Sequence, residues 1–404
     1  MSADEQFDGV GKRVKTDRKL AGMTQADLAR EAHVSLSLVK QVEQGKVPAS
    51  PAFIASVSAA LKTRAAKLKG QPYEDDTPSS RRLHGGIAEL RREIAAYRLP
   101  PDDAPPASPA RLRAAVAEAS KLRHRAKLDA LGDELPSLLR ALRTAIHHAD
   151  GHERDVLFGL LAEAYAAAGQ VAYKLGYDDL STLTTDRVEW AANQSGDPLA
   201  CAAADFYVAG ELIVNAEWRG ALQYLEDARA KIADEVRRGD EAALAMHGVL
   251  HLKSGLAAAR AGNADSSDDH LAEAREMADL VTSGSDHYRL AFDRDSVNIW
   301  SVGLAVERQD GTEAVKRAEK FGSRFSTSTP RERVGHHWID LSRAYQLHGD
   351  RDKALATLYR ARKVTPQMTR KHPQVRETLV TLAEHDRRRS DTLTGMASWV
   401  GVRL

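Results

Sequence analysis

The side chains best suited to chemistry in this chain lie near its N-terminus, where amides alternate with cations. The amide of Gln41 can bridge N6 and N7 of an adenine, and the side chain of Leu36 can contact the methyl group of a thymine. Gln25, Lys40 and Lys46 suit phosphate oxygens or a groove edge, contacts that fix register without reading bases. These residue types would bind DNA if one structural element presented them together.

Two short helices joined by a turn are predicted to position these side chains. Thr24 is a good N-cap and Asp27 places a carboxylate in the first turn, so a helix begins at Gln25. Ser35 caps a second helix, which Gly45 ends as its C′ residue. The apolar residues that bury one side of this pair repeat at helical spacing: Leu28, Ala29, Leu38, Val39 and Val42.

Further helices are expected on both sides of this pair. The first of them would carry Val10, Val14, Arg18 and Leu20, and a closing helix after Pro48 and Pro51 would carry Phe53, Ile54, Val57 and Leu61. Over residues 8–62 the sequence resembles the lambda-repressor-like, xenobiotic-response-element type of helix-turn-helix DNA-binding domain. The resemblance implies that the second helix of the motif enters the major groove.

The resemblance also implies a set of DNA contacts. Leu36, Ser37 and Gln41 would read bases, although Leu36 departs from the polar residue often found there and the base preference cannot be transferred. The full set of DNA-contacting residues that we predict is Gln25, Ser35, Leu36, Ser37, Lys40, Gln41 and Lys46. Glu43 is expected to hold the motif together by pairing with Arg13 or Arg18.

The charge distribution agrees with a DNA-binding N-terminal part. Residues 1–70 hold 12 Lys and Arg against 7 Asp and Glu, a net charge of +5, whereas the whole chain carries +1. Residues 71–404 therefore carry a net charge of −4. A basic N-terminal part on an acidic remainder is expected of a protein that docks only one end on phosphate.

Composition restricts the fold and the compartment. The 404 residues suffice for two or three domains, and abundant Ala, Leu, Arg and Glu with 5% aromatic residues indicate an all-α chain. We expect no membrane segment, because no apolar run of about eighteen residues is evident and residues 1–5 are acidic. Cys201, the single cysteine, is expected to be a small buried hydrophobe. A cytoplasmic, nucleoid-associated protein follows from these features.

Two stretches divide the predicted helices. Residues 70–80 and the segment 99–109, which has five prolines, read as connections on either side of a short helix at 87–97. We therefore predict a DNA-binding domain over residues 1–69, a linker over 70–109 and a helical domain over 110–404. Residues 1–69 are called the head below, and residues 70–404 the body.

The helical domain is predicted to be a right-handed α-solenoid of five to seven hairpins that resemble tetratricopeptide repeats (TPR). The clearest repeat has residues at eight signature spacings: Trp338, Leu341, Ser342, Tyr345, Ala354, Leu358, Ala361 and Pro366. Looser copies keep parts of the same spacing near residues 169–188, 209–228, 255–274 and 300–321, and each alone could be a generic helix pair. The helices after His372 are expected to cap the solenoid or, alternatively, to form a dimer surface with Leu379, Leu382, Trp399 and Val400, of which the last two are expected to be exposed.

The first helix of each hairpin should face a concave surface on which an effector could bind. The candidate effector contacts are Gln170, Tyr173, Asn215, Asn298, Trp300, His336, Arg343 and Gln346, with Glu163, Phe206 and Glu307 on the same predicted surface. For any one of them, ordinary packing between repeats is the alternative. No metal ligand set and no cofactor site is expected.

The combination of head and solenoid resembles actinobacterial regulators and the peptide-pheromone sensors of the RRNPP type. The resemblance implies a homodimeric transcription regulator that binds an inverted-repeat operator in double-stranded DNA and is modulated by an effector, most simply a short peptide. A protein-docking scaffold and a small-molecule sensor are the alternatives. An enzyme is not expected, since neither a His-Glu-x-x-His motif nor a Gly-x-Ser-x-Gly motif occurs. The sequence leaves open the operator, the effector, the dimer interface and the direction of regulation.

Overall fold

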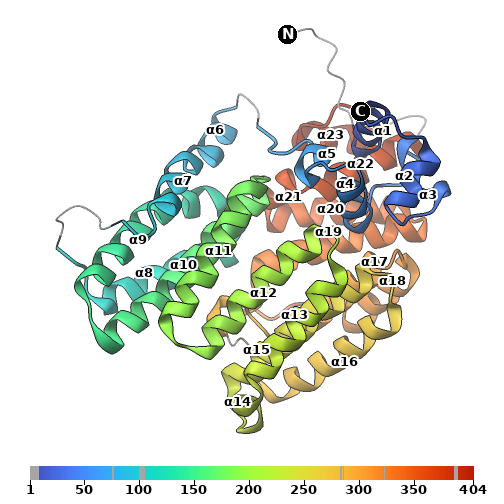
Figure 1. Cartoon of the computed structure of the whole chain (residues 1–404). Helices are drawn as coiled ribbons and strands as arrows, with labels where there is room; N and C mark the ends of the chain where they lie inside the picture. The colour runs from blue at the N-terminus through green and yellow to red at the C-terminus, as the bar shows by residue number, and fades with distance from the viewer. Residues whose placement is uncertain are drawn as a thin grey trace.

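The computed structural model describes residues 9–74, 77–99, 105–282, 284, 286–322, 324–385 and 390–404. Within these ranges every regular element is a helix, as the composition predicted. The acidic residues 1–5 and parts of both expected connections, residues 75–76 and 100–104, lie outside the described residues. Figure 1 shows the head packed against the last helices of the body.

The head contains five helices around a core of its own. They are α1 (Val10–Leu20), α2 (Gln25–Glu31), α3 (Leu36–Glu43), α4 (Pro51–Ala60) and α5 (Ala65–Lys69). The predicted caps are present: the Thr24 side chain accepts from the backbone of Asp27 in a full capping box, and the Ser35 side chain accepts from Leu38. Leu28, Val39 and Val57 are fully buried between the helices. Leu20, by contrast, is 79% exposed.

Two helices lie in the segment that the sequence indicated as a connection. The expected short helix is α7 (Ile87–Ala95), and α6 (Pro78–Gly85) precedes it. Both pack against α9, and Leu90 and Ile94 are completely buried there. Much of residues 70–109 thus shares a hydrophobic core with the helices that follow residue 109, while the domain limits at 69 and 109 stay predictions.

The remaining helices form the solenoid-like body. They are α8 (Pro109–His124), α9 (Leu128–His148), α10 (Gly151–Leu175), α11 (Asp178–Ser195), α12 (Pro198–Val214), α13 (Trp218–Lys231), α14 (Ala233–Arg237), α15 (Glu241–Arg260), α16 (Ala264–Leu280), the 3₁₀ helix η1 (His287–Arg289), α17 (Arg294–Glu307), α18 (Gly311–Phe321), α19 (Arg331–His348), α20 (Arg351–Val364), α21 (Pro366–Lys371), α22 (Pro373–His385) and α23 (Asp391–Val400). Successive helices pack as pairs, such as α10 with α11, α15 with α16 and α19 with α20.

The pair α19 and α20 corresponds to the clearest sequence repeat. Ser342 and Ala354 are completely buried where the two helices cross, and the Ser342 hydroxyl donates to the carbonyl of Ala354 at 2.8 Å. Leu358 fills the same interface. Helix α20 ends at Val364, and Pro366 is the first residue of α21. A small residue at position 342 of the repeat lets the two helices approach each other closely, and the buried contact of Ser342 agrees with this reason.

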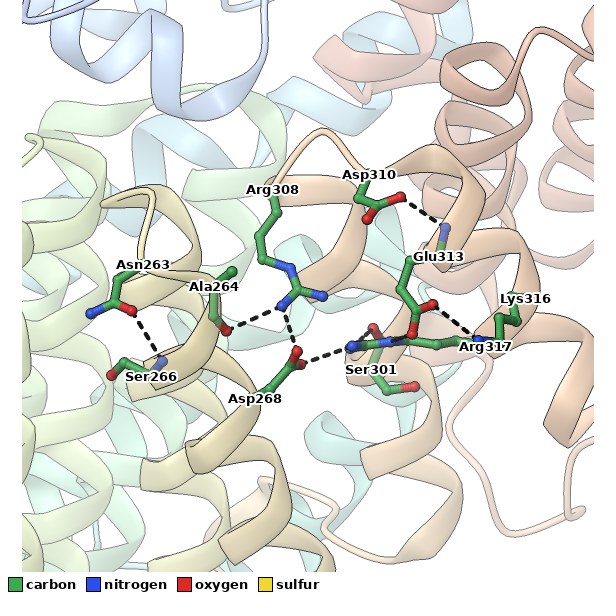
Figure 2. Close-up of polar contacts among 10 residues, drawn as sticks. All are labelled: Asn263, Ala264, Ser266, Asp268, Ser301, Arg308, Asp310, Glu313, Lys316 and Arg317. Atoms are coloured by element: carbon green, nitrogen blue, oxygen red, sulfur yellow. Dashed lines mark hydrogen bonds and ion pairs between the residues drawn. The ribbon is translucent and has the colours of Figure 1, made fainter.

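Polar contacts join neighbouring pairs on the outer surface of the body. Asp268 of α16 accepts from Arg308, which follows α17, at 2.7 Å and from Arg317 of α18 at 2.9 Å. Arg317 also donates to Glu313 of its own helix at 2.8 Å. Figure 2 shows this carboxylate lying between the two guanidinium groups. One side chain thus connects three successive helices.

The C-terminal helices cover the end of the solenoid. Leu379, Leu382 and Val400 are buried against the preceding helices, and Trp399 is partly buried in the same core. This burial agrees with a capping role and leaves these four side chains little part in a free dimer surface. It also corrects the expectation that Trp399 and Val400 are exposed.

One further expectation needs correction. Within the part of the chain that the structure describes, α10 is long and apolar enough to cross a membrane, although no such stretch was expected. However, 61% of its most apolar window is buried inside the protein. Leu161 and Tyr165 of this helix are completely buried. The apolar character of α10 is therefore explained by its place in the core of the body.

Cys201 is partly buried, in a position where burial raises the pKa of its thiol.

Candidate functional site

Helix α3 presents an exposed polar face. Val39 and Val42 anchor its inner side in the core of the head. On its outer side Ser37, Lys40 and Gln41 are exposed, and Leu36 is 38% exposed. The amide of Gln41 donates to the hydroxyl of Ser37 at 3.2 Å. Four of the predicted DNA contacts thus share one accessible surface at the outer edge of the head (Figure 1).

The other three predicted contacts lie at the ends of this helix pair. Ser35 uses its hydroxyl to cap α3, and Lys46 is exposed just after Gly45, which has a φ of +74°. Gln25 instead donates its amide to Glu43 at 2.7 Å. Any phosphate contact of Gln25 would have to compete with this internal hydrogen bond.

A buried ion pair fixes α3 relative to α1. Arg18 donates to both carboxylate oxygens of Glu43, at 2.6 and 3.0 Å, and to the carbonyl of Met23 at 2.7 Å. Burial acts to raise the pKa of Glu43, but the hydrogen bonds from Arg18 and Gln25 hold it below its usual range. Of the two predicted partners of Glu43, Arg18 is the correct one, whereas Arg13 donates to the carbonyl of Leu68 at 3.3 Å.

A cavity of about 300 Å³ lies between the head and the concave side of the body. We call it the interdomain cavity. The head contributes α4 and α5, with Ile54 and Lys69 among the lining residues. The body contributes α10, α12, α15, α17 and α19, with Tyr173, Trp300 and Arg343 among them. The volume is at the lower end of the range for ligand pockets.

A second cavity of about 220 Å³ extends along the concave side, and we call it the groove cavity. Its walls come mainly from α10, α11, α12, α15 and α19, with Gln170, Phe206 and Lys253 among the lining residues. The residues that line both cavities are Lys69, Tyr173, Val214, Leu256, Arg260, Trp300, Arg333 and His336. The two hollows therefore adjoin along one concave surface.

Most of the predicted effector contacts lie at these cavities. Tyr173, Trp300 and His336 line both of them. Gln170 lines the groove cavity, and Arg343 lines the interdomain cavity. Phe206 of the same predicted surface lines the groove cavity, and Glu307 the interdomain cavity.

The remaining candidates lie outside both cavities. Gln346 lines a small hollow of about 10 Å³ between α19 and the head. Asn215 is exposed and donates its amide to the carbonyl of Glu211 as it ends α12. Asn298 lies outside both linings, and Glu163 is held in an ion pair with Arg289 at 2.9 Å.

Two of the charged groups at the interdomain cavity are linked through Glu307. Its carboxylate accepts from Arg260 at 2.8 Å and from Arg343 at 2.9 Å. Burial acts to raise the pKa of Glu307, but the two guanidinium groups hold it below its usual range. Arg343 also pairs with Asp340 at 3.0 Å, where burial raises the pKa of the carboxyl group. These charges are satisfied within the protein.

Comparison with known families identifies the head. A helix-turn-helix domain family matches residues 10–68. This segment is a helix-turn-helix domain. A comparison with curated proteins found no match for the chain.

Two solved structures are similar to this chain over about two thirds of its length. The crystal structure of BtubC (BKLC) from P. vanneervenii has 14% identity and a TM-score of 0.36, covering 69% of this chain and 92% of that chain. The structure of Bacillus thuringiensis PlcR in complex with the peptide PapR7 and DNA has 14% identity and a TM-score of 0.28, covering 67% of this chain and 95% of that chain. These values are too low to assign a function.

Sequence reasoning missed several charged residues of the cavities. Lys174 forms a buried ion pair with Glu332, whose pKa is held low by Lys174 and nearby arginines despite its burial. Lys69, Lys253 and Arg333 also line the groove cavity. No repeat signature includes these positions, and Lys69 is the last residue of the head. Only the docking of the head on the body brings it to the cavity.

Proposed function

We propose that the protein is a sequence-specific DNA-binding transcription regulator whose body binds an effector in the adjoining interdomain and groove cavities. Helix α3 would enter the major groove of an inverted-repeat operator, with Leu36, Ser37 and Gln41 at base edges. Two copies would bind as a homodimer, because one such domain contacts a single half-site and successive half-sites are about 34–36 Å apart. The protein would act on the nucleoid in the cytoplasm.

The observation that carries this proposal is the placement of the helix-turn-helix domain. Its α4 and α5 form one wall of the interdomain cavity, whereas α3 contributes no residue to that cavity or to the groove cavity. The outer face of α3 is accessible at the same time. A ligand in the cavity would therefore touch the domain that binds DNA without occupying its DNA-reading surface.

An effector acts through the difference in its affinity for two states of the protein. A change in operator affinity of about 5- to 150-fold corresponds to ~1–3 kcal/mol of coupling free energy. A short peptide is the effector that we propose, since Gln170 and His336 offer polar contacts for a peptide backbone and Tyr173 and Trp300 offer aromatic walls.

The protein-docking alternative requires a contiguous exposed apolar patch of several hundred Å². In the described part of the chain, the large exposed apolar side chains belong to six separate segments: Leu20, Leu36, Leu99, Tyr173, Leu183 and Leu280. This distribution favours a sensor with an internal cavity over a docking scaffold.

DNA selection tests the proposal directly. The full-length protein is incubated with a random duplex library, and the bound fraction is sequenced over several rounds. We expect enrichment of an inverted repeat that Gln41→Ala no longer enriches. Gln44→Ala is the matched control, because Gln44 is also exposed but lies at the C-terminal end of α3. Enrichment of no sequence, or equal enrichment by both variants, would reject base reading by α3.

A further inference from the structure

Three cations at the groove cavity have no carboxylate partner. Lys69 ends α5 of the head, Lys253 lies on α15 and Arg333 on α19, and all three line this cavity. Among the described residues none of them forms an ion pair, in contrast to Arg260, Arg343 and Lys174 nearby. An unpaired positive charge in a partly enclosed site requires an explanation.

Asp178, Glu211 and Glu332 also line the groove cavity, but the direct contacts of two of the cations are with aromatic rings and a neutral carbonyl. The ammonium group of Lys253 lies 4.0 Å from the centre of the Phe206 ring. Arg333 lies 5.9 Å from the centre of the Trp300 ring, and its hydrogen bond goes to the carbonyl of Leu290 at 3.2 Å. These contacts use aromatic faces and a neutral carbonyl, so neither cation pairs directly with a carboxylate, and Glu211 and Glu332 act on them only from beyond ion-pair distance.

The pKa values of these three cations are lowered, so keeping them charged in the folded protein costs free energy. Burial, together with Arg260 and Arg333, lowers the pKa of Lys253 to about 7. Burial also lowers the pKa of Lys69 and of Arg333, and it outweighs the opposing effects of Asp178 on Lys69 and of Glu332 on Arg333. Unpaired charges are expensive to desolvate, and such strained groups in a cavity are typical of binding sites.

The remaining walls suit an apolar body. Phe206, Tyr207 and Leu256 line the groove cavity beside the cations. Tyr173 and Trp300 line it as well and continue into the interdomain cavity, and Tyr173 is 50% exposed there. A large aromatic side chain left open in a cavity offers a stacking surface to a ligand.

We propose that the groove cavity binds an amphipathic organic anion, with its acidic group among Lys69, Lys253 and Arg333 and its apolar part against Phe206 and Trp300. The inference rests on the proposed function and gives the effector its chemistry, an apolar body with a carboxylate or a similar acid. Because Lys69 is the last residue of the head, the anion contacts the head and the body together.

A matched pair of dyes tests this inference. The probe is 8-anilinonaphthalene-1-sulfonate, and its control is N-phenyl-1-naphthylamine, which has the same aromatic frame without the acidic group. Fluorescence titration of the full chain is expected to give at least tenfold tighter binding of the sulfonate. Equal affinities would overturn the proposal.

Variants then locate the site. Lys253→Met should weaken binding of the sulfonate about tenfold and leave the neutral dye unaffected. Its melting temperature should rise, because a strained charge is replaced by an apolar side chain of similar shape. Lys316→Met is the matched control, since Lys316 lies on α18 with 80% of its side chain exposed. Unchanged sulfonate binding by Lys253→Met, or an equal loss by Lys316→Met, would overturn the assignment.

Competition separates the two sources of such an anion. Displacement of the dye by decanoate, but not by decanamide, would indicate that the anion is a fatty acid. Displacement by N-acetyl-Leu-Phe, but not by its C-terminal amide, would indicate that it is a peptide. The dye assay needs no DNA. Sulfonate binding with no operator enrichment would therefore uphold the anion site and reject the regulator, whereas the reverse result would reject the anion site alone.

Discussion

The backbone N–H of Val10, the first residue of α1, donates a hydrogen bond to Oε1 of Glu377 on α22 at 3.1 Å. Two neighbouring contacts follow the same pattern. Gln374 donates its amide to the carbonyl of Ala49 at 3.2 Å, and Lys371 donates to the carbonyl of Tyr73. Gln374 and Glu377 are three apart on α22, whereas Lys371 ends α21 and contacts Tyr73 just beyond the head, so one face of α22 holds the head against the body.

Removing the carboxylate of Glu377 should loosen the head. The Glu377→Leu variant leaves the Val10 N–H without its partner, a loss of about 1.5–3 kcal/mol for a hydrogen bond to a charged group. Amide hydrogen exchange of the full chain should show faster exchange in α1 and unchanged exchange in α15 and α16. Glu377→Gln, which keeps an acceptor oxygen, should change less. Uniform acceleration over the whole chain would show that Glu377 supports the body as well.

The ion pair of Arg18 and Glu43 should be essential for the fold of the head. Their side chains are 9% and 2% exposed, and breaking such a buried pair costs about 3–5 kcal/mol. We expect Glu43→Gln to melt the head before the body and to abolish DNA binding, as followed by hydrogen exchange of α2 and α3. Glu31→Gln is the control, because Glu31 pairs with Arg30 at 3.7 Å on the surface. A cooperative transition like that of the wild type would contradict this role.

Acid should destabilise the body through its neutral buried histidines. Burial lowers the pKa of His247, His336 and His337 to about 4, and that of His251, also affected by Arg229, to about 2. The unfolded chain takes up protons near pH 6.5 while the folded chain does not. Stability is therefore fully present above pH 6.5 and falls as the pH drops towards 4, by up to ~1.4 kcal/mol per pH unit for each histidine.

Urea unfolding at pH 7.5, 6.0 and 5.0 measures this dependence. The His337→Leu variant removes one titrating group that is 1% exposed, so its stability should fall less steeply with acid than that of the wild type. A wild-type stability that does not change over this range would contradict the assignment of neutral histidines.

The sequence was most informative where structure is decided locally. Thr24 and Ser35 cap their helices because an N-cap needs only its own next three residues. The spacing of Ser342 and Ala354 predicted a helix pair for a similar reason, because these residues lie on two helices that follow each other in the sequence. Asn215, however, was predicted to face a ligand, and it ends α12 by bonding to its own helix.

Long-range contacts explain what the sequence could not show. The hydrogen bond from Val10 to Glu377 joins the two ends of the chain, and no local pattern encodes it. This docking brings Lys69 to the same cavity as Lys253 and Arg333. On a helical pattern these three positions resemble ordinary solvated cations. Whether these three cations lie together depends on which surface of the body the head covers.

Genome-wide mapping of bound DNA in the source organism tests the central claim most directly, comparing the wild type with Gln41→Ala and the control Gln44→Ala. We predict sharp sites with an inverted repeat for the wild type and for Gln44→Ala, and loss of these sites for Gln41→Ala. Diffuse occupancy by the wild type, or unchanged sites for Gln41→Ala, would contradict sequence-specific regulation through α3.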